Sequence, residues 1–205
     1  EVVGPFTIAG LLGQGGMGEV VLARDKRLNR KVAIKRLKEE LGASRRAAQR
    51  FLTEAQSVAA LNHFNIVQIY EFGRDADGPL LVLEYVSGGS LLDRLKEGKL
   101  EVEDAISITC QLCDALAVAH QKGIIHRDIK PSNVLISVGK DVRPGLKLTD
   151  FGSAHAIRPD LESHDEESLV GTATYMPPEQ IRGKIRDSGP WTDLYSIGVL
   201  AWVFT

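Results

Sequence analysis

The sequence has little cysteine, few aromatic residues and no excess of either charge. Only two of its 205 residues are cysteines, and aromatic residues make up 6%. Two cysteines cannot form a disulfide framework, which favours a reducing compartment and a cytoplasmic location. Lys and Arg total 25 against 27 Asp and Glu, so the net charge is −2. This balance produces no general basic field, and nucleic acid is therefore not an expected partner.

Long apolar runs are also absent. The longest extends over residues 194–204 and is too short to span a bilayer, which needs about 20 residues. The first ten residues contain neither the basic nor the apolar region of a signal peptide. No membrane segment is therefore expected within this chain. Its 43% hydrophobic and 25% charged residues are typical of a folded globular protein, and its length suits one large domain or two small lobes.

The first part of the chain predicts strands, and the rest predicts mainly helices. Short apolar and β-branched runs separated by turn residues predict strands at 6–12, 19–24, 31–37, 66–72 and 79–85. Helical spacing of apolar residues predicts helices over 43–62, 102–122 and 191–205, with short strands at 134–136 and 146–148. We therefore expect an α+β fold with two lobes. Residues 1–86 would form a small lobe of five strands and one helix, and residues 87–205 a mainly helical lobe.

Two cysteines and two histidines have structural interpretations. Cys110 and Cys113 lie on the predicted apolar side of helix 102–122, together with Ile106. Because no second pair of ligands exists, we expect buried thiols rather than a zinc site. His63 and His120 are expected to be hydrogen-bonded structural residues.

Gly13, Gly15 and Gly18 form the pattern Gly-x-Gly-x-x-Gly, followed by Val20, between two predicted strands. Glycine lets a backbone close over phosphates with its amide groups. A dinucleotide-binding fold would need a helix directly after the glycines, whereas a strand is predicted here. The motif alone leaves open a phosphate-binding loop and an ordinary glycine-rich hairpin.

Lys35 ends the run Val-Ala-Ile-Lys on a predicted strand. A lysine on an apolar strand needs a carboxylate partner and an anionic ligand. Glu54 on the following helix can supply that carboxylate. The alternative is an edge-strand lysine that points to solvent.

Two further motifs follow the long predicted helix. His126-Arg127-Asp128-Ile-Lys130-Pro-Ser-Asn133 is followed, 17 residues after Asn133, by Asp150-Phe151-Gly152. With the glycine-rich run and Val-Ala-Ile-Lys35, in this order, they resemble the signature motifs of the eukaryotic-type protein kinases. The resemblance covers residues 6–205 and is strongest to the bacterial serine/threonine-protein kinases, on Leu61-Asn-His63 and Gly171-Thr-Ala-Thr-Tyr175-Met.

The resemblance implies a catalytic set. Asp128 would accept the proton of a substrate hydroxyl, and Lys130 would reach the γ-phosphate of ATP. Thr172 would brace both residues. Lys35 would hold the α- and β-phosphates, while Glu54 fixes its ammonium group.

The resemblance also implies how ATP and its metal would be bound. Asn133 and Asp150 would bind Mg²⁺, with Mn²⁺ as an alternative, because both supply hard oxygen ligands. The adenine would bind the backbone of segment 84–86, with Leu83 behind it. The implied nucleotide contacts are Leu12, Gly13, Gly15, Gly18, Val20, Ala33, Lys35, Glu84, Val86 and Leu135. Ser90 replaces the acid that many family members use for the ribose.

The implied function is transfer of the ATP γ-phosphate to Ser or Thr hydroxyls of protein substrates, in bacterial signalling. Two alternatives stay open. A pseudokinase acting as a binding module would require the loss of Lys35, Asp128, Asn133 or Asp150, and none is lost. A small-molecule kinase is disfavoured by segment 171–179, which docks peptide substrates in protein kinases.

The C-terminal part departs from the family pattern. Met176-Pro177-Pro178-Glu179 replaces the usual Ala-Pro-Glu. The resemblance implies that Glu179 pairs with an arginine later in the lobe, which usually lies beyond residue 205. Asp193 matches the aspartate that anchors the backbone at His126 and Arg127. The resemblance further implies that the helical lobe is truncated at residue 205, and a membrane anchor after that residue would be compatible with a cytoplasmic kinase.

Regulation is expected to involve the predicted loop at 158–168. Arg127 directly precedes Asp128, an arrangement that in the family requires a neutralising phosphate. Ser168 lies where many relatives carry that phosphate, and Arg50 and His155 match positions that surround it. We therefore expect autophosphorylation, in trans within a homodimer. One alternative is a permanent anion, supplied by Glu166 or Glu167. The other is phosphorylation of Ser163 or Thr174 in place of Ser168.

Overall fold

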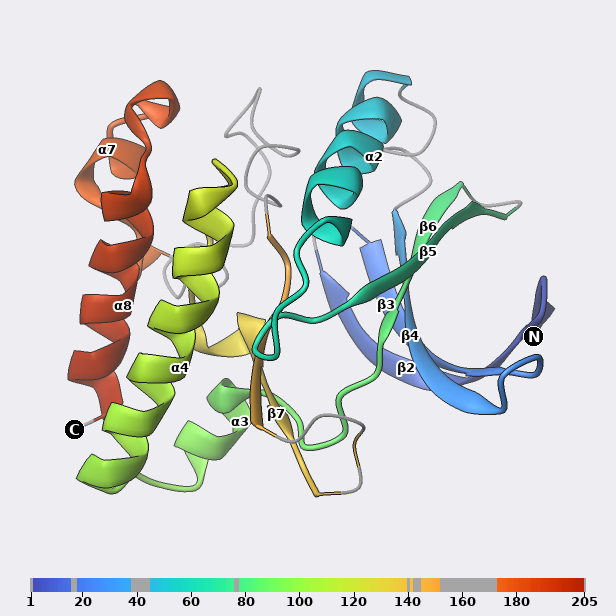
Figure 1. Cartoon of the computed structure of the whole chain (residues 1–205), viewed down its shortest axis with the longest axis horizontal. Helices are drawn as coiled ribbons and strands as arrows, with labels where there is room; N and C mark the ends of the chain where they lie inside the picture. The colour runs from blue at the N-terminus through green and yellow to red at the C-terminus, as the bar shows by residue number, and fades with distance from the viewer. Residues whose placement is uncertain are drawn as a thin grey trace. The chain divides into compact units, whose positions relative to one another are not determined.

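The computed structural model describes residues 2–15, 18–37, 45–75, 78–139, 141, 145–151 and 173–204 (Figure 1). The chain divides into two compact units. The first unit contains residues 1–60 and 67–85, and the second contains residues 61–66 and 86–205. Segment 61–66 therefore belongs to the second unit, although it lies within the stretch expected to form the first lobe.

The first unit contains a six-stranded antiparallel sheet in the order β1-β2-β3-β4-β6-β5 (Figure 1). Its strands are β1 (Val2–Val3), β2 (Phe6–Gly15), β3 (Gly18–Asp25), β4 (Arg30–Leu37), β5 (Ile69–Arg74) and β6 (Pro79–Glu84). Five strands were expected. β1 was missed because two residues are too short to show an alternating pattern. β5 begins later than predicted because Ile66 pairs instead with Leu148, within the second unit.

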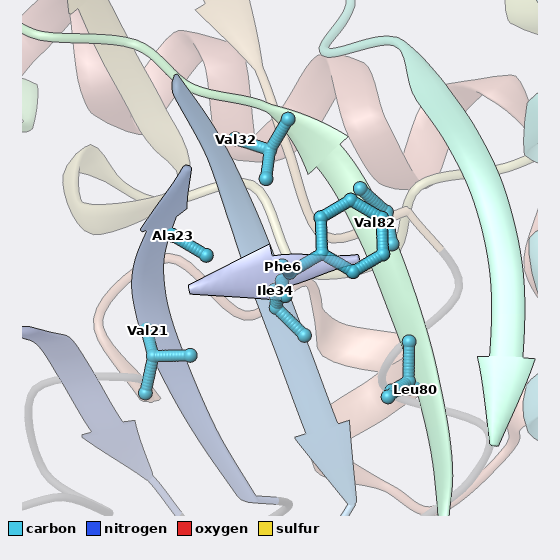
Figure 2. Packing of buried hydrophobic residues seen from close by; sticks show 7 residues of the cluster. All are labelled: Phe6, Val21, Ala23, Val32, Ile34, Leu80 and Val82. Carbon is cyan, nitrogen blue, oxygen red and sulfur yellow. The ribbon is translucent and has the colours of Figure 1, made fainter. Parts of the chain in front are cut away.

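The two faces of this sheet carry different residues. One face holds the hydrophobic core of the unit, which Figure 2 shows: Phe6, Val21, Ala23, Val32, Ile34, Leu80 and Val82. Side chains alternate between faces along a strand, so the intervening residues lie on the other face. There Val20 pairs directly with Lys35, which in turn pairs with Leu81, while Ala33 pairs with Leu83. Lys35 thus lies on the face opposite the core.

One helix accompanies the sheet. α2 (Arg45–Ala59) contacts β5 and buries Phe51 and Ala55, which are one helical turn apart. The Phe51 ring lies with its centroid 6.5 Å from that of Phe72 on β5. The predicted helix 43–62 therefore exists, with described bounds at residues 45 and 59.

The second unit is mainly helical, with α4 beside α8 (Figure 1). Its elements are α3 (Leu91–Lys96), α4 (Val102–Gln121), η1 (Pro131–Asn133), β7 (Val134–Ser137), β8 (Gly145–Leu148), α7 (Pro178–Ile181), η2 (Ile185–Asp187) and α8 (Pro190–Phe204). β7 and β8 pair as an antiparallel two-stranded sheet. In the part of the chain described, no helix combines the length and apolar character needed to cross a membrane.

The buried face of α4 differs from the predicted one. The buried residues are Ala105, Leu112, Ala115, Leu116 and Ala119. Cys110 and Ile106 are exposed, and Cys113 is half-buried, so the prediction of two buried thiols was wrong. Burial raises the pKa of the Cys113 thiol, and the charges of Cys110 and Asp114 add to the effect. The error arose because apolar residues occur on two faces of this helix, and the face rich in small alanines allows closer packing.

Candidate active site

The backbone at His126 and Arg127 is held by one buried carboxylate from α8. Asp193 is fully buried; its Oδ2 accepts hydrogen bonds from the His126 N–H (2.9 Å) and from His120 Nε2 (2.7 Å). Its Oδ1 accepts from the Arg127 N–H at 2.8 Å. This confirms the predicted anchoring role of Asp193 and the structural role of His120. A carboxylate that accepts several donors offsets its own cost of burial.

Arg127 has a backbone conformation that non-glycine residues rarely adopt, with φ at 67°. Both polar groups of its backbone are bound, because the carbonyl accepts a hydrogen bond from Gln180 Nε2 of α7 at 3.0 Å. A strained residue persists only where its surroundings over-determine it. Gln180 was not recognised from the sequence, since a glutamine after Pro-Pro-Glu carries no local signal.

His126 connects this backbone to the strand that ends before Asp150. The imidazole is fully buried; Nδ1 accepts from the Asp128 N–H (3.2 Å), and Nε2 donates to the Thr149 carbonyl (2.8 Å). A backbone N–H only donates and a carbonyl only accepts, so the neutral Nε2–H tautomer is specified. The His126 ring also lies 4.6 Å from the Phe151 ring between centroids. The motif His126-Arg127-Asp128 is thus a positioned unit rather than a flexible loop.

Asp128, Lys130 and Asn133 come together as the motif predicts. Asp128 Oδ2 lies 3.0 Å from Lys130 Nζ and accepts a hydrogen bond from Asn133 Nδ2 at 3.1 Å. The same Asn133 nitrogen donates to the Asp128 carbonyl at 2.7 Å. Both of these side-chain contacts therefore fall on Oδ2.

The strand before Asp150 is fixed by two buried residues that no sequence motif indicated. Asn65 Nδ2 donates to the Leu146 carbonyl (2.8 Å) and to Gln111 Oε1 (3.0 Å). The fully buried Lys147 donates from Nζ to the Phe64 carbonyl at 2.8 Å. These contacts tie segment 61–66 to β8, and His63 joins them by accepting from the Asn65 N–H at 3.1 Å. The structural role expected for His63 is thereby confirmed.

Asn133 and Asp150 fit a cation that also binds phosphate oxygens. Asn133 uses its nitrogen for Asp128, and its Oδ1 is a hard oxygen of the kind that Mg²⁺ binds. Asp150 has φ at 62°, a second strained non-glycine residue at the predicted site. In the described residues, no group of three or more His, Cys, Asp or Glu could enclose a metal ion. Mg²⁺ is commonly bound by one or two protein oxygens together with substrate phosphates, so this donor set suits it.

The first unit contains the glycine-rich hairpin. β2 and β3 pair up to Gly15 and Gly18, and the register shifts at Leu12, which is exposed. A Cβ atom at Gly18 would collide with the Arg36 carbonyl on β4. Glycine at this position is therefore required by packing, whatever the hairpin binds. Gly13 and Gly15, by contrast, have open space where a Cβ atom would stand.

A partly buried ion-pair cluster that the sequence did not reveal begins directly after Gly18, where β3 pairs with β4. Arg36 Nη1 is 3.0 Å from Glu19 Oε1, and its Nε is 3.1 Å from Asp75 Oδ2. Lys35 lies next to it on the opposite face of β4. Because β4 is bordered by β3 and β6, the alternative of an edge-strand Lys35 is wrong.

The segment expected to bind adenine begins at the end of β6. Glu84 is buried; its N–H donates to the Gln68 carbonyl (2.9 Å), and its Oε2 accepts from the Gln68 N–H (3.2 Å). Val86 is buried, and Leu135 on β7 is half-buried and bridges to Ser90. Ser90 caps α3 and donates from Oγ to Asp93 at 2.6 Å. The side chain of Ser90 therefore has a local role in the helix cap.

Glu179 forms a hydrogen bond with α8. Its Oε1 accepts a hydrogen bond from Thr192 Oγ1 at 2.7 Å. Ser196 also binds this region, because its hydroxyl donates to the Tyr175 carbonyl at 2.7 Å. α8 thus holds both the segment around α7 and, through Asp193, the His126–Arg127 backbone.

Several predicted residues lie outside the described part of the chain. For Glu54 and Arg50, only the side chains lie outside it. The whole residue lies outside it for Gly152, His155, Ser163, Glu166, Glu167, Ser168 and Thr172.

Comparison with known proteins identifies the family. Residues 6–205 match the protein kinase domain family. Serine/threonine-protein kinase PknB of Mycobacterium leprae is 42% identical over 202 residues, which cover 96% of this chain and 32% of that protein. Serine/threonine-protein kinase pkn2 of Myxococcus xanthus is 43% identical over 97% of this chain and 24% of that protein. Serine/threonine-protein kinase PrkC of Bacillus subtilis is 39% identical over 98% of this chain and 30% of that protein. The chain spans a third or less of the length of these relatives.

The fold and the matched motifs define the class of protein. The chain belongs to the protein kinase domain family. The relatives named above are serine/threonine-protein kinases, a class of phosphotransferases that use ATP and a divalent metal ion. The predicted α+β kinase fold is confirmed, and so is the resemblance to bacterial serine/threonine kinases.

Proposed function

We propose that this chain catalyses transfer of the ATP γ-phosphate to Ser and Thr hydroxyls of protein substrates in bacterial signalling. The observation that carries the proposal is the cluster of Asp128, Lys130 and Asn133 on a backbone that Asp193 and Gln180 hold. Phosphoryl transfer depends mainly on positioning and charge stabilisation, and this cluster supplies both. The chain would act as the cytoplasmic catalytic portion of a longer protein, in keeping with its two unpaired cysteines.

Each residue of the cluster has a separate task. Asp128 Oδ1 would accept the proton of the substrate hydroxyl while Oδ2 stays bound to Lys130 and Asn133. Lys130 would offset the charge that develops on the γ-phosphate, and Thr172 would brace it. Mg²⁺ would neutralise the phosphate oxygens, with Asn133 and Asp150 as its protein ligands.

ATP would bind through the residues that the resemblance to the family implies. Gly13, Gly15 and Gly18 would present amide groups to the phosphates, and Lys35, fixed by Glu54, would hold the α- and β-phosphates. The adenine would contact the backbone of Glu84 and Val86. The apolar contacts proposed for the purine are Leu12, Val20, Ala33 and Leu135.

A phosphotransfer assay tests the proposal. The full-length protein is incubated with labelled ATP and Mg²⁺, with a generic protein acceptor in one reaction and an aminoglycoside in another. We expect label on the protein acceptor alone. Label on the aminoglycoside would favour a small-molecule kinase, and nucleotide binding without transfer to either acceptor would favour a pseudokinase.

The acceptor residues are expected to be Ser and Thr. Lys130 lies 3.0 Å from Asp128, and both Lys130 and Thr172 match residues that the resemblance assigns to kinases of Ser and Thr. Phosphoamino-acid analysis of the autophosphorylated full-length protein measures this, with Asp150→Ala as the unlabelled control. Predominant phosphotyrosine would contradict the class of acceptor proposed here.

Autophosphorylation at Ser168 is proposed as the activating step, in trans between two copies. A phosphate would neutralise Arg127, and Arg50 and His155 would join it. Ser168→Ala is expected to lower kcat/KM about tenfold, because one to three charge-assisted hydrogen bonds would be lost. Mass spectrometry of active protein identifies the phosphorylated residue, and Ser163→Ala and Thr174→Ala serve as matched controls. Unchanged activity of Ser168→Ala with no phosphate on Ser168 in the wild type would rule out this site.

A further inference from the structure

The segment that follows Val86 is paired closely with β7. The Gly88 N–H donates to the Ile136 carbonyl, and the Ile136 N–H donates to the Gly89 carbonyl, both at 2.9 Å. A Cβ atom at Gly88 would lie only 2.9 Å from Val138 Cγ1 and even closer to the Ile136 carbonyl oxygen. Segment 87–90 therefore has a defined backbone path that allows no side chain at position 88.

Asp141, from the turn between β7 and β8, binds the start of this segment. One oxygen, Oδ2, accepts hydrogen bonds from the Ser87 N–H (3.1 Å), the Ser137 hydroxyl (2.9 Å) and the Val138 N–H (3.1 Å). Burial alone would raise the pKa of Asp141, but the hydrogen bonds from Ser87, Ser137 and Val138 outweigh it and lower the pKa. The carboxylate is therefore charged at neutral pH, where it accepts hydrogen bonds most strongly.

The hydrogen bond from the Ser87 N–H to Asp141 also fixes the neighbouring peptide group. The Ser87 N–H belongs to the same planar peptide group as the Val86 carbonyl, and in a trans peptide the two groups point in opposite directions. No cis peptide bond occurs in the described residues. Holding the Ser87 N–H therefore sets the orientation of the Val86 carbonyl and restricts ψ of Val86. Val86 is a residue whose backbone is proposed to bind adenine.

We propose that Asp141 is a positioning residue for the nucleotide, acting through the Val86–Ser87 peptide rather than by contact with ATP. This inference rests on the proposed function, because it assigns the support of the adenine-binding backbone. Ser137 and Gly88 contribute to the same arrangement. Ser137 orients the Asp141 carboxylate, and Gly88 lets segment 87–90 approach β7. The motifs of the family carry no signal for Asp141, since the turn between β7 and β8 lies between two of them.

The test compares Asp141→Ala with Ser137→Ala in the full-length protein. Asp141→Ala is expected to raise KM for ATP and Kd for adenosine about tenfold, because it removes a charge-assisted hydrogen bond to the backbone. The value of kcat at saturating ATP and KM for the protein acceptor should stay near those of the wild type. Ser137→Ala leaves the bond to Ser87 in place, so its effect should be clearly smaller. Gly88→Ala should reproduce the loss of adenosine binding.

Adenosine separates a positioning role from a general loss of structure and from a failure of the proposed function. It lacks phosphates and reports only on the adenine and ribose contacts. Wild-type affinities for adenosine and ATP in Asp141→Ala would overturn the proposal. A fall in kcat and in affinity for the protein acceptor that is as large as the fall in affinity for adenosine would overturn it as well. If the wild type binds adenosine but transfers no phosphate, the proposed function fails, while the Asp141 comparison can still be made by binding alone.

Discussion

Replacing Asp150 with alanine is expected to lower kcat/KM on the order of 10³-fold, because the variant would lack a ligand proposed for the ion that neutralises the phosphates. Lys35→Met should cause a loss of similar size, since it removes the cation proposed to hold the α- and β-phosphates. Both variants are measured in the full-length protein with a protein acceptor and saturating Mg²⁺.

A matched control is Asp104→Ala, which removes an exposed carboxylate on α4 away from the motifs. Its turnover should equal that of the wild type. Circular dichroism should show that all three variants are folded. Near-normal turnover of Asp150→Ala with Mg²⁺ would mean that Asp150 is not the metal ligand.

Replacing Asp193 with alanine is expected to lower both stability and turnover. The variant leaves the buried N–H groups of His126 and Arg127 without their acceptor. An unsatisfied buried donor costs roughly 1–3 kcal/mol, so the free energy of unfolding should fall by about 2–6 kcal/mol. Turnover should fall as well, because Asp128 directly follows the two released residues. Urea unfolding followed by far-UV circular dichroism measures the first effect.

His120→Ala is the matched control for Asp193, because it removes only the third partner and keeps both backbone hydrogen bonds. Its loss of stability should be smaller, and its turnover should stay close to that of the wild type. Equal stability of Asp193→Ala and wild type would contradict the structural role, and equal effects of the two variants would assign that role to His120 instead.

Some of the fold could be predicted because the signal is local. Helix 102–122 was predicted within one residue of α4, since a helix of five turns shows its period clearly. Strand 79–85 was predicted within one residue of β6 by its continuous apolar run. The start of β5 and the buried face of α4 could not be predicted, because each depends on a partner element elsewhere in the chain.

The candidate site divides in the same way. Asp128, Lys130 and Asn133 lie within six consecutive positions, so their motif could be recognised and their proximity expected. Asn65 and Lys147 bind carbonyl groups 81 and 83 residues away in the sequence. Asp141 binds a backbone N–H that lies 54 residues earlier. No periodicity or local motif carries that information.

The order of the four motifs, the kinase family and the kinds of side chain available for phosphoryl transfer could all be obtained from the amino-acid sequence. The groups that hold those side chains in place became known through the three-dimensional packing. Asp193 was expected to anchor the loop, whereas Gln180, Lys147 and Asp141 emerged from the packing alone. This division arises because the chemistry of a site depends on residue type, which the sequence states directly. The positions of the side chains depend instead on hydrogen bonds to backbone groups. These groups are the same in nearly every residue, so the sequence pattern does not reveal which of them are bound.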